Sequence, residues 1–419
     1  SQDVNIRYEA QARFFRAFLY FQLAKRHTQG TENGGLILYK DLNMKKDMPL
    51  SSAADVWQLI YEDLTFAAEN LPESWDSANT GRITKYAAYA FLSRAMLYAE
   101  RWQDAKDAAD KVINSGMYSL TANYEDAYKG GNSESIIQFA YNGVSGPSHT
   151  FDKDYVPYGD YALVPSDEYG GKGTPTQEMV EYYETKDGNQ VDWSEWHSET
   201  RNNPPYDQLE PRFHATIIYP GSTWKGREIM PTENSTSGRF MEYRAEAYAN
   251  GRTTTGYYLR KMLDESITTT LMSIPSSHTW VELRLAEVYL NRAEALHRLG
   301  GNDAGARADI NTVRARVGLP ASKIEDTFEA IRHERLIELA YEGHLYWDMR
   351  RWELAHTEYN NYRCHGLKVT GPDFEGKYKW NYVDCDLEDR KFLTKFYILP
   401  VPTSETDNNS AVQQFDEWK

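Results

Sequence analysis

The sequence predicts a mainly α protein, in which tetratricopeptide-like helical pairs form a scaffold and an irregular lobe of short strands and loops is interleaved with it. Apolar residues recur at helical spacing before residue 117 and again after residue 277. Between these limits the composition shifts to Gly, Pro, Tyr, Asn and Thr. We therefore expect one intertwined globular body with four parts: 1–116 and 278–356 as scaffold, 117–277 as a loop-rich insert, and 357–419 as a loop-rich C-terminal segment.

Four helices are expected in the first part, at 4–26, 55–70, 83–100 and 102–114. The first has apolar residues at helical spacing, namely Tyr8, Ala12, Phe15, Leu19 and Leu23. A Ser52-x-x-Asp55 capping signal precedes the second. The third is almost wholly apolar and is expected to be central. Helix, short turn, helix is the antiparallel pair of a tetratricopeptide unit.

Three of the predicted helices share an Arg-Ala step in an apolar setting, at Arg16-Ala17, Arg94-Ala95 and Arg292-Ala293. A small Ala at a crossing point lets two helices approach closely. The second and third copies lie far apart in the chain, so a long insert separates the early helical pairs from the later ones.

The stretch 325–353 begins as a helix in which Arg335 points into the apolar arc. A buried guanidinium is tolerated only if carboxylates bind it, and Glu338 is the expected partner, three residues on along the same helix. We interpret Arg335, Glu338 and Glu342 as a structural ion-pair cluster. A dinuclear metal site needs Glu-x-x-His pairs, whereas His344 follows Glu342 by only two residues.

The net charge of −16 argues against nucleic acid as a partner, because phosphate contacts need clustered Lys and Arg. No run of 18 apolar residues exists, so no segment is expected to span a membrane. The sequence has no G-x-S-x-G, H-E-x-x-H or P-loop motif. We therefore predict a protein that is not an enzyme and that uses no cofactor and no metal.

The two cysteines, Cys364 and Cys385, lie in a late loop-like stretch without a Cys-x-x-Cys motif, which argues against zinc. In an oxidising compartment we expect a disulfide between them. Closing a loop of about 20 residues would stabilise the fold by roughly 3 kcal/mol.

A polar, proline-broken stretch of the insert carries flat aromatic side chains that suit sugar binding, namely Trp193, Trp196, Tyr206 and Trp224. Polar residues interleave with them, among them Asp192, Arg201 and Asn202. Aromatic rings match the apolar face of a sugar, and the polar groups match its hydroxyls. We predict that these seven residues bind ligand; the alternative is that the tryptophans anchor the loop onto the helices.

Several motifs resemble the SusD-like (RagB/SusD) family. I-x-x-E-R-x-x-E-L-x-x-E-G at 331–343, followed by W-D-x-R-R-W at 347–352, is similar to its C-terminal signature, and L-P-V-P-T-S-E at 399–405 to its closing motif. The stretch around Glu210 resembles the family's D-P-R step, with Glu where Asp is more usual. The resemblance covers nearly all of the chain.

The resemblance implies a surface glycan-binding subunit that works with a SusC-like, TonB-dependent outer-membrane barrel. It implies an extracellular, lipid-anchored place on the outer membrane, through an N-terminal anchor not present in this chain, so we expect the chain to start inside the mature protein. Some relatives collect peptides instead of oligosaccharide. Two further alternatives are a tetratricopeptide adaptor and a helical glycoside hydrolase. Binding of a partner protein would identify the adaptor, and release of reducing ends from a polysaccharide would identify the hydrolase.

Overall fold

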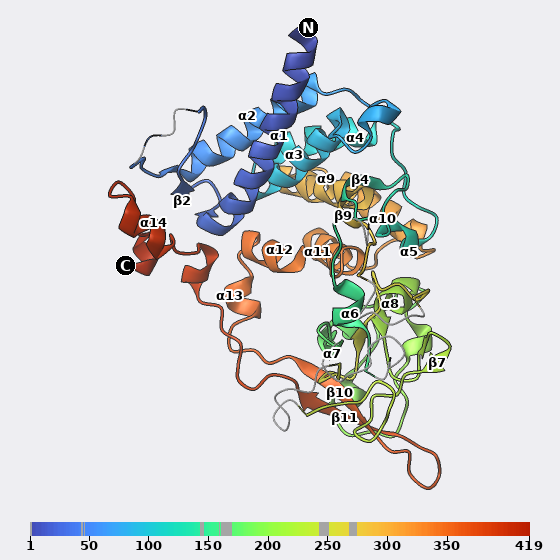
Figure 1. Cartoon of the computed structure of the whole chain (residues 1–419). Helices are drawn as coiled ribbons and strands as arrows, with labels where there is room; N and C mark the ends of the chain where they lie inside the picture. The colour runs from blue at the N-terminus through green and yellow to red at the C-terminus, as the bar shows by residue number, and fades with distance from the viewer. Residues whose placement is uncertain are drawn as a thin grey trace.

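The computed structural model describes residues 2–42, 45, 47–142, 146–158, 160, 170–242, 251–267 and 275–419. Helices group on one side of the molecule, and short strands and loops form a lobe on the other (Figure 1). This arrangement confirms the predicted fold class. No described helix is both long and apolar enough to cross a bilayer.

The scaffold is a stack of helices in which each packs on the next. The helices are α1 (Gln2–His27), α2 (Ala53–Asn70), α3 (Lys85–Tyr98), α4 (Trp102–Ile113), α9 (Leu285–Leu299), α10 (Asp303–Arg316) and α11 (Thr327–Glu338). The stack passes directly from α4 to α9, although the whole insert separates them in the chain. The shorter α12 (Leu345–Arg351) follows α11.

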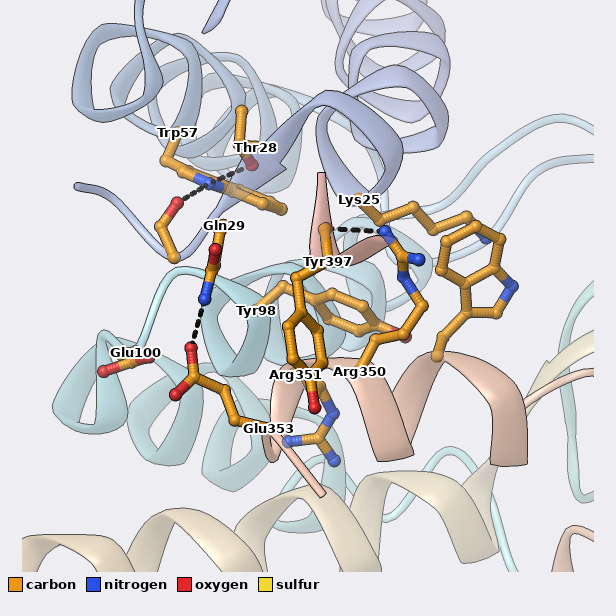
Figure 2. Close-up of a pocket in the computed structure, with 12 residues that line it drawn as sticks. Lys25, Thr28, Gln29, Trp57, Tyr98, Glu100, Arg350, Arg351, Glu353 and Tyr397 are labelled. Carbon is orange, nitrogen blue, oxygen red and sulfur yellow. Dashed lines mark hydrogen bonds between the residues drawn. The ribbon is translucent and has the colours of Figure 1, made fainter. Parts of the chain in front are cut away.

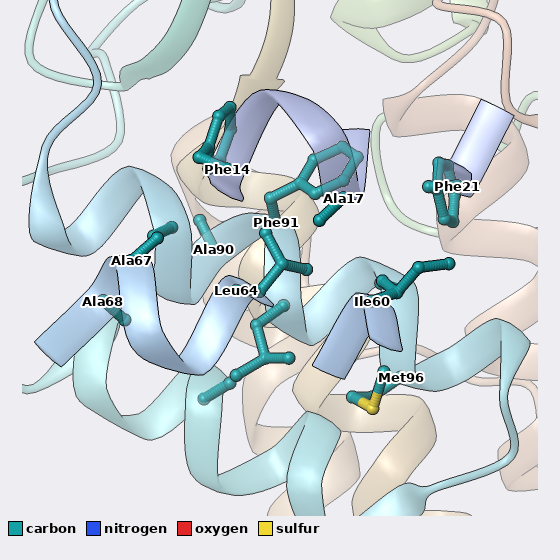
Figure 3. Packing of buried hydrophobic residues seen from close by; sticks show 14 of the residues in the cluster. Phe14, Ala17, Phe21, Ile60, Leu64, Ala67, Ala68, Ala90, Phe91 and Met96 are labelled. Atoms are coloured by element: carbon teal, nitrogen blue, oxygen red, sulfur yellow. The ribbon is translucent and has the colours of Figure 1, made fainter. Parts of the chain in front are cut away.

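The core of the stack is built from small and aromatic residues of successive helices. Phe14 and Phe21 of α1 face Phe91 of α3, with ring centroids 5.8 and 5.1 Å apart (Figure 3). Alanines such as Ala17 and Ala67 are fully buried and let the backbones approach. The Ser52 cap is confirmed, because its hydroxyl accepts a hydrogen bond from the Asp55 N–H at 3.1 Å.

Helix α1 has a second apolar face that the described residues leave open. Tyr8, Phe15, Leu19 and Leu23, whose spacing predicts the helix, are 45–61% exposed. The opposite face, which contains Phe14, packs on the core. The stack therefore ends on an apolar stripe.

Each Arg-Ala step joins neighbouring helices. All three alanines are fully buried. Arg16 binds both oxygens of Asp63 on α2 at 2.7 Å, and Arg292 binds Asp309 on α10 at 2.8 and 2.6 Å. The repeated step thus places an ion pair beside a close helix crossing.

The lobe consists of very short elements. They are α5 (Tyr124–Ala127), α6 (Phe151–Tyr155), α7 (Gln177–Glu181), α8 (Pro211–Thr216), β5 (Ile217–Ile218), β6 (Thr223–Trp224), β7 (Arg227–Glu228) and β8 (Tyr258–Leu259). One antiparallel pair, β4 (Ser135–Phe139) with β9 (Trp280–Arg284), links the lobe to the scaffold because β9 runs directly into α9.

The C-terminal segment crosses the lobe and then returns to the scaffold. After α13 (Ala355–Glu358) it forms the antiparallel hairpin β10 (His365–Thr370) and β11 (Lys379–Asp384), and it ends near α14 (Thr403–Asn408). Leu399 N–H donates to the Arg26 carbonyl at 2.7 Å. There the chain lies beside the small sheet of β1 (Thr28–Gln29), β2 (Asn33–Leu36) and β3 (Ser51–Ser52) (Figure 1).

Glu338 and Glu342 lie in a buried network of ion pairs. The Glu338 carboxylate binds Arg212, Arg284 and Arg316, and Glu342 binds Arg284 and Lys261. Burial alone would raise the pKa of Glu338, but the three arginines outweigh it and hold that pKa well below its usual range.

The predicted pairing of Arg335 with Glu338 is wrong. Arg335 binds both oxygens of Asp348 on α12, at 3.0 and 3.2 Å, and the Asn291 side chain at 2.9 Å. The Glu338 carboxylate instead binds arginines from distant parts of the chain, so the i,i+3 spacing within one helix did not predict its partners.

The predicted disulfide is absent, because Cys364 and Cys385 are both free thiols. They lie opposite each other at the open end of the β10–β11 hairpin, where Cys385 N–H donates to the Cys364 carbonyl at 2.8 Å. The Cys385 thiol donates instead to the Thr254 carbonyl, 3.1 Å away. Burial raises the pKa of Cys364 to about 12.

Candidate functional site

The four aromatic residues predicted to stack on sugar are buried. Trp193, Trp196 and Tyr206 are 4–9% exposed and form the core of the lobe, where the ring of Tyr206 lies 6.2 Å from that of Trp380. Trp224 is fully buried in a second cluster. The prediction of an exposed stacking surface is therefore wrong, because Trp193, Trp196 and Tyr206 pack on one another and on the C-terminal hairpin, and Trp224 packs in the second cluster.

The three polar residues predicted beside them are exposed, and each forms a hydrogen bond or ion pair with another residue of the protein. Asp192 accepts the Ser194 N–H at 3.0 Å, and Arg201 binds Asp373 at 2.8 Å. Asn202 donates to Glu195 at 2.5 Å. A ligand-binding role for Asp192, Arg201 and Asn202 remains a prediction, now without the aromatic faces that motivated it.

An open aromatic cleft lies elsewhere, where the lobe meets β9. It has a volume of about 260 Å³. Its walls are mostly half-buried aromatic side chains, and it is lined by Tyr141, His149, Thr150, Phe151, Asp154, Tyr155, His278 and Trp280. We define these eight residues as the aromatic cleft.

Long-range pairing brings the walls of the aromatic cleft together. His149 and Ser276 form an antiparallel bridge, with N–H to carbonyl distances of 3.0 and 2.9 Å in the two directions. This bridge sets the segment that contains α6 beside the segment that leads into β9. Trp280 pairs with Phe139 at the end of the β4–β9 ladder, which fixes the far wall.

Five rings of the aromatic cleft form one continuous row, namely those of Tyr141, His149, His278, Phe151 and Tyr155. Phe151 and Tyr155 stack one helical turn apart on α6, with centroids at 4.4 Å. Phe151 meets the edge of His278 at 5.3 Å, His278 meets His149 at 4.3 Å, and His149 meets Tyr141 at 4.7 Å. Phe151 and Trp280 also pack on a buried cluster beneath them, so the walls are anchored to the lobe core.

Hydrogen bonds hold the polar groups of the aromatic cleft in place. Asp154 accepts the Thr150 hydroxyl and the Lys172 ammonium, both at 2.7 Å. His149 Nδ1 accepts the Phe151 N–H at 3.3 Å, so its other nitrogen, Nε2, donates to the His278 carbonyl at 3.0 Å. Burial lowers the pKa of His149 below its usual value, which favours this neutral tautomer.

Behind the aromatic cleft, Asp152 is a buried structural carboxylate. It accepts the Ser276 hydroxyl at 2.6 Å and the Asp264 N–H at 2.8 Å. Burial alone would raise its pKa, but these bonds and nearby His278 lower it overall. Within the described ranges no three His, Cys, Asp or Glu side chains are grouped to hold a metal.

A second cavity, near the C-terminal end of α1, is far smaller. It has a volume of about 40 Å³, which is room for one or two water molecules. Lys25, Trp57, Tyr98 and Tyr397 enclose it, and the Gln29 amide donates to Glu353 at its edge (Figure 2). A sugar ring does not fit there, so the aromatic cleft is the better candidate.

Sequence reasoning missed the aromatic cleft because its residues come from two distant segments, 141–155 and 278–280. The one local signal was the pair Phe151 and Tyr155, four residues apart in a polar segment.

Two family models match this sequence. The SusD family model matches residues 133–418, and a model described as starch-binding associating with outer membrane matches residues 2–97. Among curated relatives, a SusD-like protein of Bacteroides ovatus is 25% identical over 97% of this chain and 73% of its own length.

Solved structures from Bacteroides fragilis have the same fold. A SusD-like protein gives a TM-score of 0.81 at 29% identity, over 99% of this chain and 80% of its own. A SusD-like carbohydrate-binding protein gives 0.79 at 25% identity, over 99% and 81%.

Proposed function

We propose, because this chain belongs to the SusD family, that it is a non-catalytic surface glycan-binding subunit of a SusC/SusD-type, TonB-dependent uptake complex. The carbohydrate-binding relative from Bacteroides fragilis supports the substrate class. In this proposal oligosaccharide binds in the aromatic cleft. The relevant observation is a row of half-buried rings around an open volume of about 260 Å³.

The aromatic cleft matches the two faces of a sugar. Phe151, Tyr155 and Trp280 offer ring surface to the apolar C–H face, and Asp154 and Thr150 offer polar groups to hydroxyls. Covering about 60 Å² of sugar face contributes roughly 1.5 kcal/mol per ring. Two or three rings, less the cost of association, give an affinity on the order of millimolar to micromolar. That range suits capture followed by release.

Titration calorimetry with a panel of neutral oligosaccharides tests the binding site. Tyr155→Ala should weaken binding by about tenfold, since it removes one ring surface. Tyr8→Ala, which truncates an exposed tyrosine on α1, is the matched control and should bind like the wild type. Binding of peptides but no sugars would move the protein to the peptide-collecting alternative.

The proposed partner is a SusC-like barrel, and the proposed location is the extracellular face of the outer membrane, reached through a lipid anchor. The family model that names association with the outer membrane supports this location. Affinity purification from native membranes should recover a large barrel subunit with the protein. Recovery of other proteins and no barrel would favour a tetratricopeptide adaptor. Release of reducing ends from a polysaccharide would instead establish a glycoside hydrolase.

A further inference from the structure

We infer that the aromatic cleft selects uncharged oligosaccharides and discriminates against glycans that carry carboxylate or sulfate groups. This inference rests on the proposed function and specifies the ligand of the same site. It follows from the charges around the aromatic cleft, which include a carboxylate at the wall and, among the described residues that line it, no lysine or arginine.

Asp154 places negative charge on the wall. Its side chain is 22% exposed, so the carboxylate is within reach of a ligand. Its two oxygens bind Thr150 and Lys172, which fix its position. Lys172, which is bound to Asp154 and 55% exposed, and neighbouring Lys153 offset part of this charge, but neither lysine lines the aromatic cleft. A ligand anion entering the aromatic cleft therefore meets a like charge.

His149 supplies polarity without positive charge. His149 uses one nitrogen as acceptor and the other as donor, an arrangement that only the neutral ring satisfies. The ring of His278 lies against His149 with centroids 4.3 Å apart. His278 Nδ1 lies 3.7 Å from the Asp152 carboxylate, so that nitrogen faces one of the protein's own acidic groups.

Hydroxyl groups of a ligand can form hydrogen bonds with the wall of the aromatic cleft that acidic groups cannot form. The Asp154 carboxylate only accepts hydrogen bonds, and a sugar hydroxyl can donate one. A uronate carboxylate or a sulfate has no proton to donate and would lose its hydration without a cation to replace it. The overall net charge of −16 adds to the repulsion.

The test uses pairs of ligands that differ only in the group at C6. Laminarihexaose, maltohexaose and cellohexaose are each titrated into the protein beside a counterpart whose C6 hydroxyls are oxidised to carboxylates. For any glycan backbone that binds, the neutral form should bind at least about fourfold more tightly at low salt. This factor corresponds to the repulsion between two like charges about 5 Å apart in water. Raising the salt should narrow the difference.

Asp154→Asn identifies the source of the discrimination, because it keeps the side-chain shape and removes the charge. It should reduce the neutral-to-oxidised affinity ratio by at least about threefold. Asp107→Asn is the matched control, since Asp107 pairs with Lys106 on the surface of α4, and it should leave the ratio unchanged. If Asp154→Asn does not fold, the salt dependence of the affinity difference in the wild-type protein still shows whether charge repulsion causes the discrimination.

Oxidised ligands that bind as tightly as the neutral ones, or more tightly, would overturn the inference and leave the glycan-binding proposal intact. If no hexasaccharide of either kind binds while peptides do, the proposed function itself fails and this inference fails with it.

Discussion

The Arg284 guanidinium binds Glu338 at two places, the side-chain carboxylate and the main-chain carbonyl. Its Nη1 donates to Oε1 at 2.6 Å and its Nη2 donates to the carbonyl oxygen at 2.7 Å. Arg284 is the last residue of β9 and Glu338 is the last residue of α11. The pair therefore fixes the β4–β9 link to the end of the scaffold stack.

Arg284→Met should destabilise the fold strongly. Glu338 and Glu342 keep other cations but lose their shared guanidinium, and removing one partner of a buried ion pair costs about 3–5 kcal/mol. Urea unfolding followed by circular dichroism measures the change. Arg363→Met removes a surface arginine that also pairs with a carboxylate, and it should leave the free energy of unfolding nearly unchanged. Equal effects of the two variants would contradict the special role of Arg284.

Stability should fall steeply in acid between pH of about 4.5 and 2. Buried cations outweigh burial and lower the pKa values of Glu287, Glu342 and Asp348 to about 2. The folded-state pKa values lie below the unfolded ones, so the stabilisation is present above pH of about 4.5 and is lost as the groups take up protons. Each carboxyl contributes on the order of 2–3 kcal/mol. Urea midpoints that are equal at pH 3 and pH 7 would show that these carboxyls do not contribute.

Trp224→Ala should reduce stability by about 3–5 kcal/mol, because the ring is fully buried and its N–H donates to Asp160 at 3.1 Å. The fraction that remains folded should bind glycan with unchanged affinity. Phe374→Ala, at a side chain 97% exposed in the β10–β11 loop, is the control and should leave the thermal midpoint unchanged. A stable Trp224→Ala protein with weakened glycan binding would restore Trp224 as a ligand contact.

The unfolded protein should show two titratable thiols, one each from Cys364 and Cys385. In the native protein both should react slowly with a thiol reagent, since they are buried and burial raises their pKa values. Ellman's assay with and without guanidinium distinguishes these states. No reactive thiol after unfolding would mean that the cysteines are bonded.

Sequence alone predicted the scaffold well because helical periodicity is local. The Ser52 cap and the alanines of the Arg-Ala steps needed only neighbouring residues to be interpreted. Periodicity did not show which face of α1 is covered, because that helix has apolar residues on two faces and only one packs on α2 and α3.

The site was less predictable because its contacts are long-range. Tyr206 lies in a polar stretch, and nothing local shows that Trp380 of the distant β11 packs beside it. The aromatic cleft likewise depends on the bridge between His149 and Ser276. The burial of Tyr206 and the formation of the aromatic cleft both depend on which loops pair with each other. The spacing of residue types along the sequence does not show this pairing.

The buried charges also restrict how the molecule can move. Arg212 and Lys261 belong to the lobe, and they reach Glu338 and Glu342 at the end of α11. A hinge between lobe and helices would have to separate these buried pairs, which is costly. The lobe and the helices should therefore move together as one rigid body.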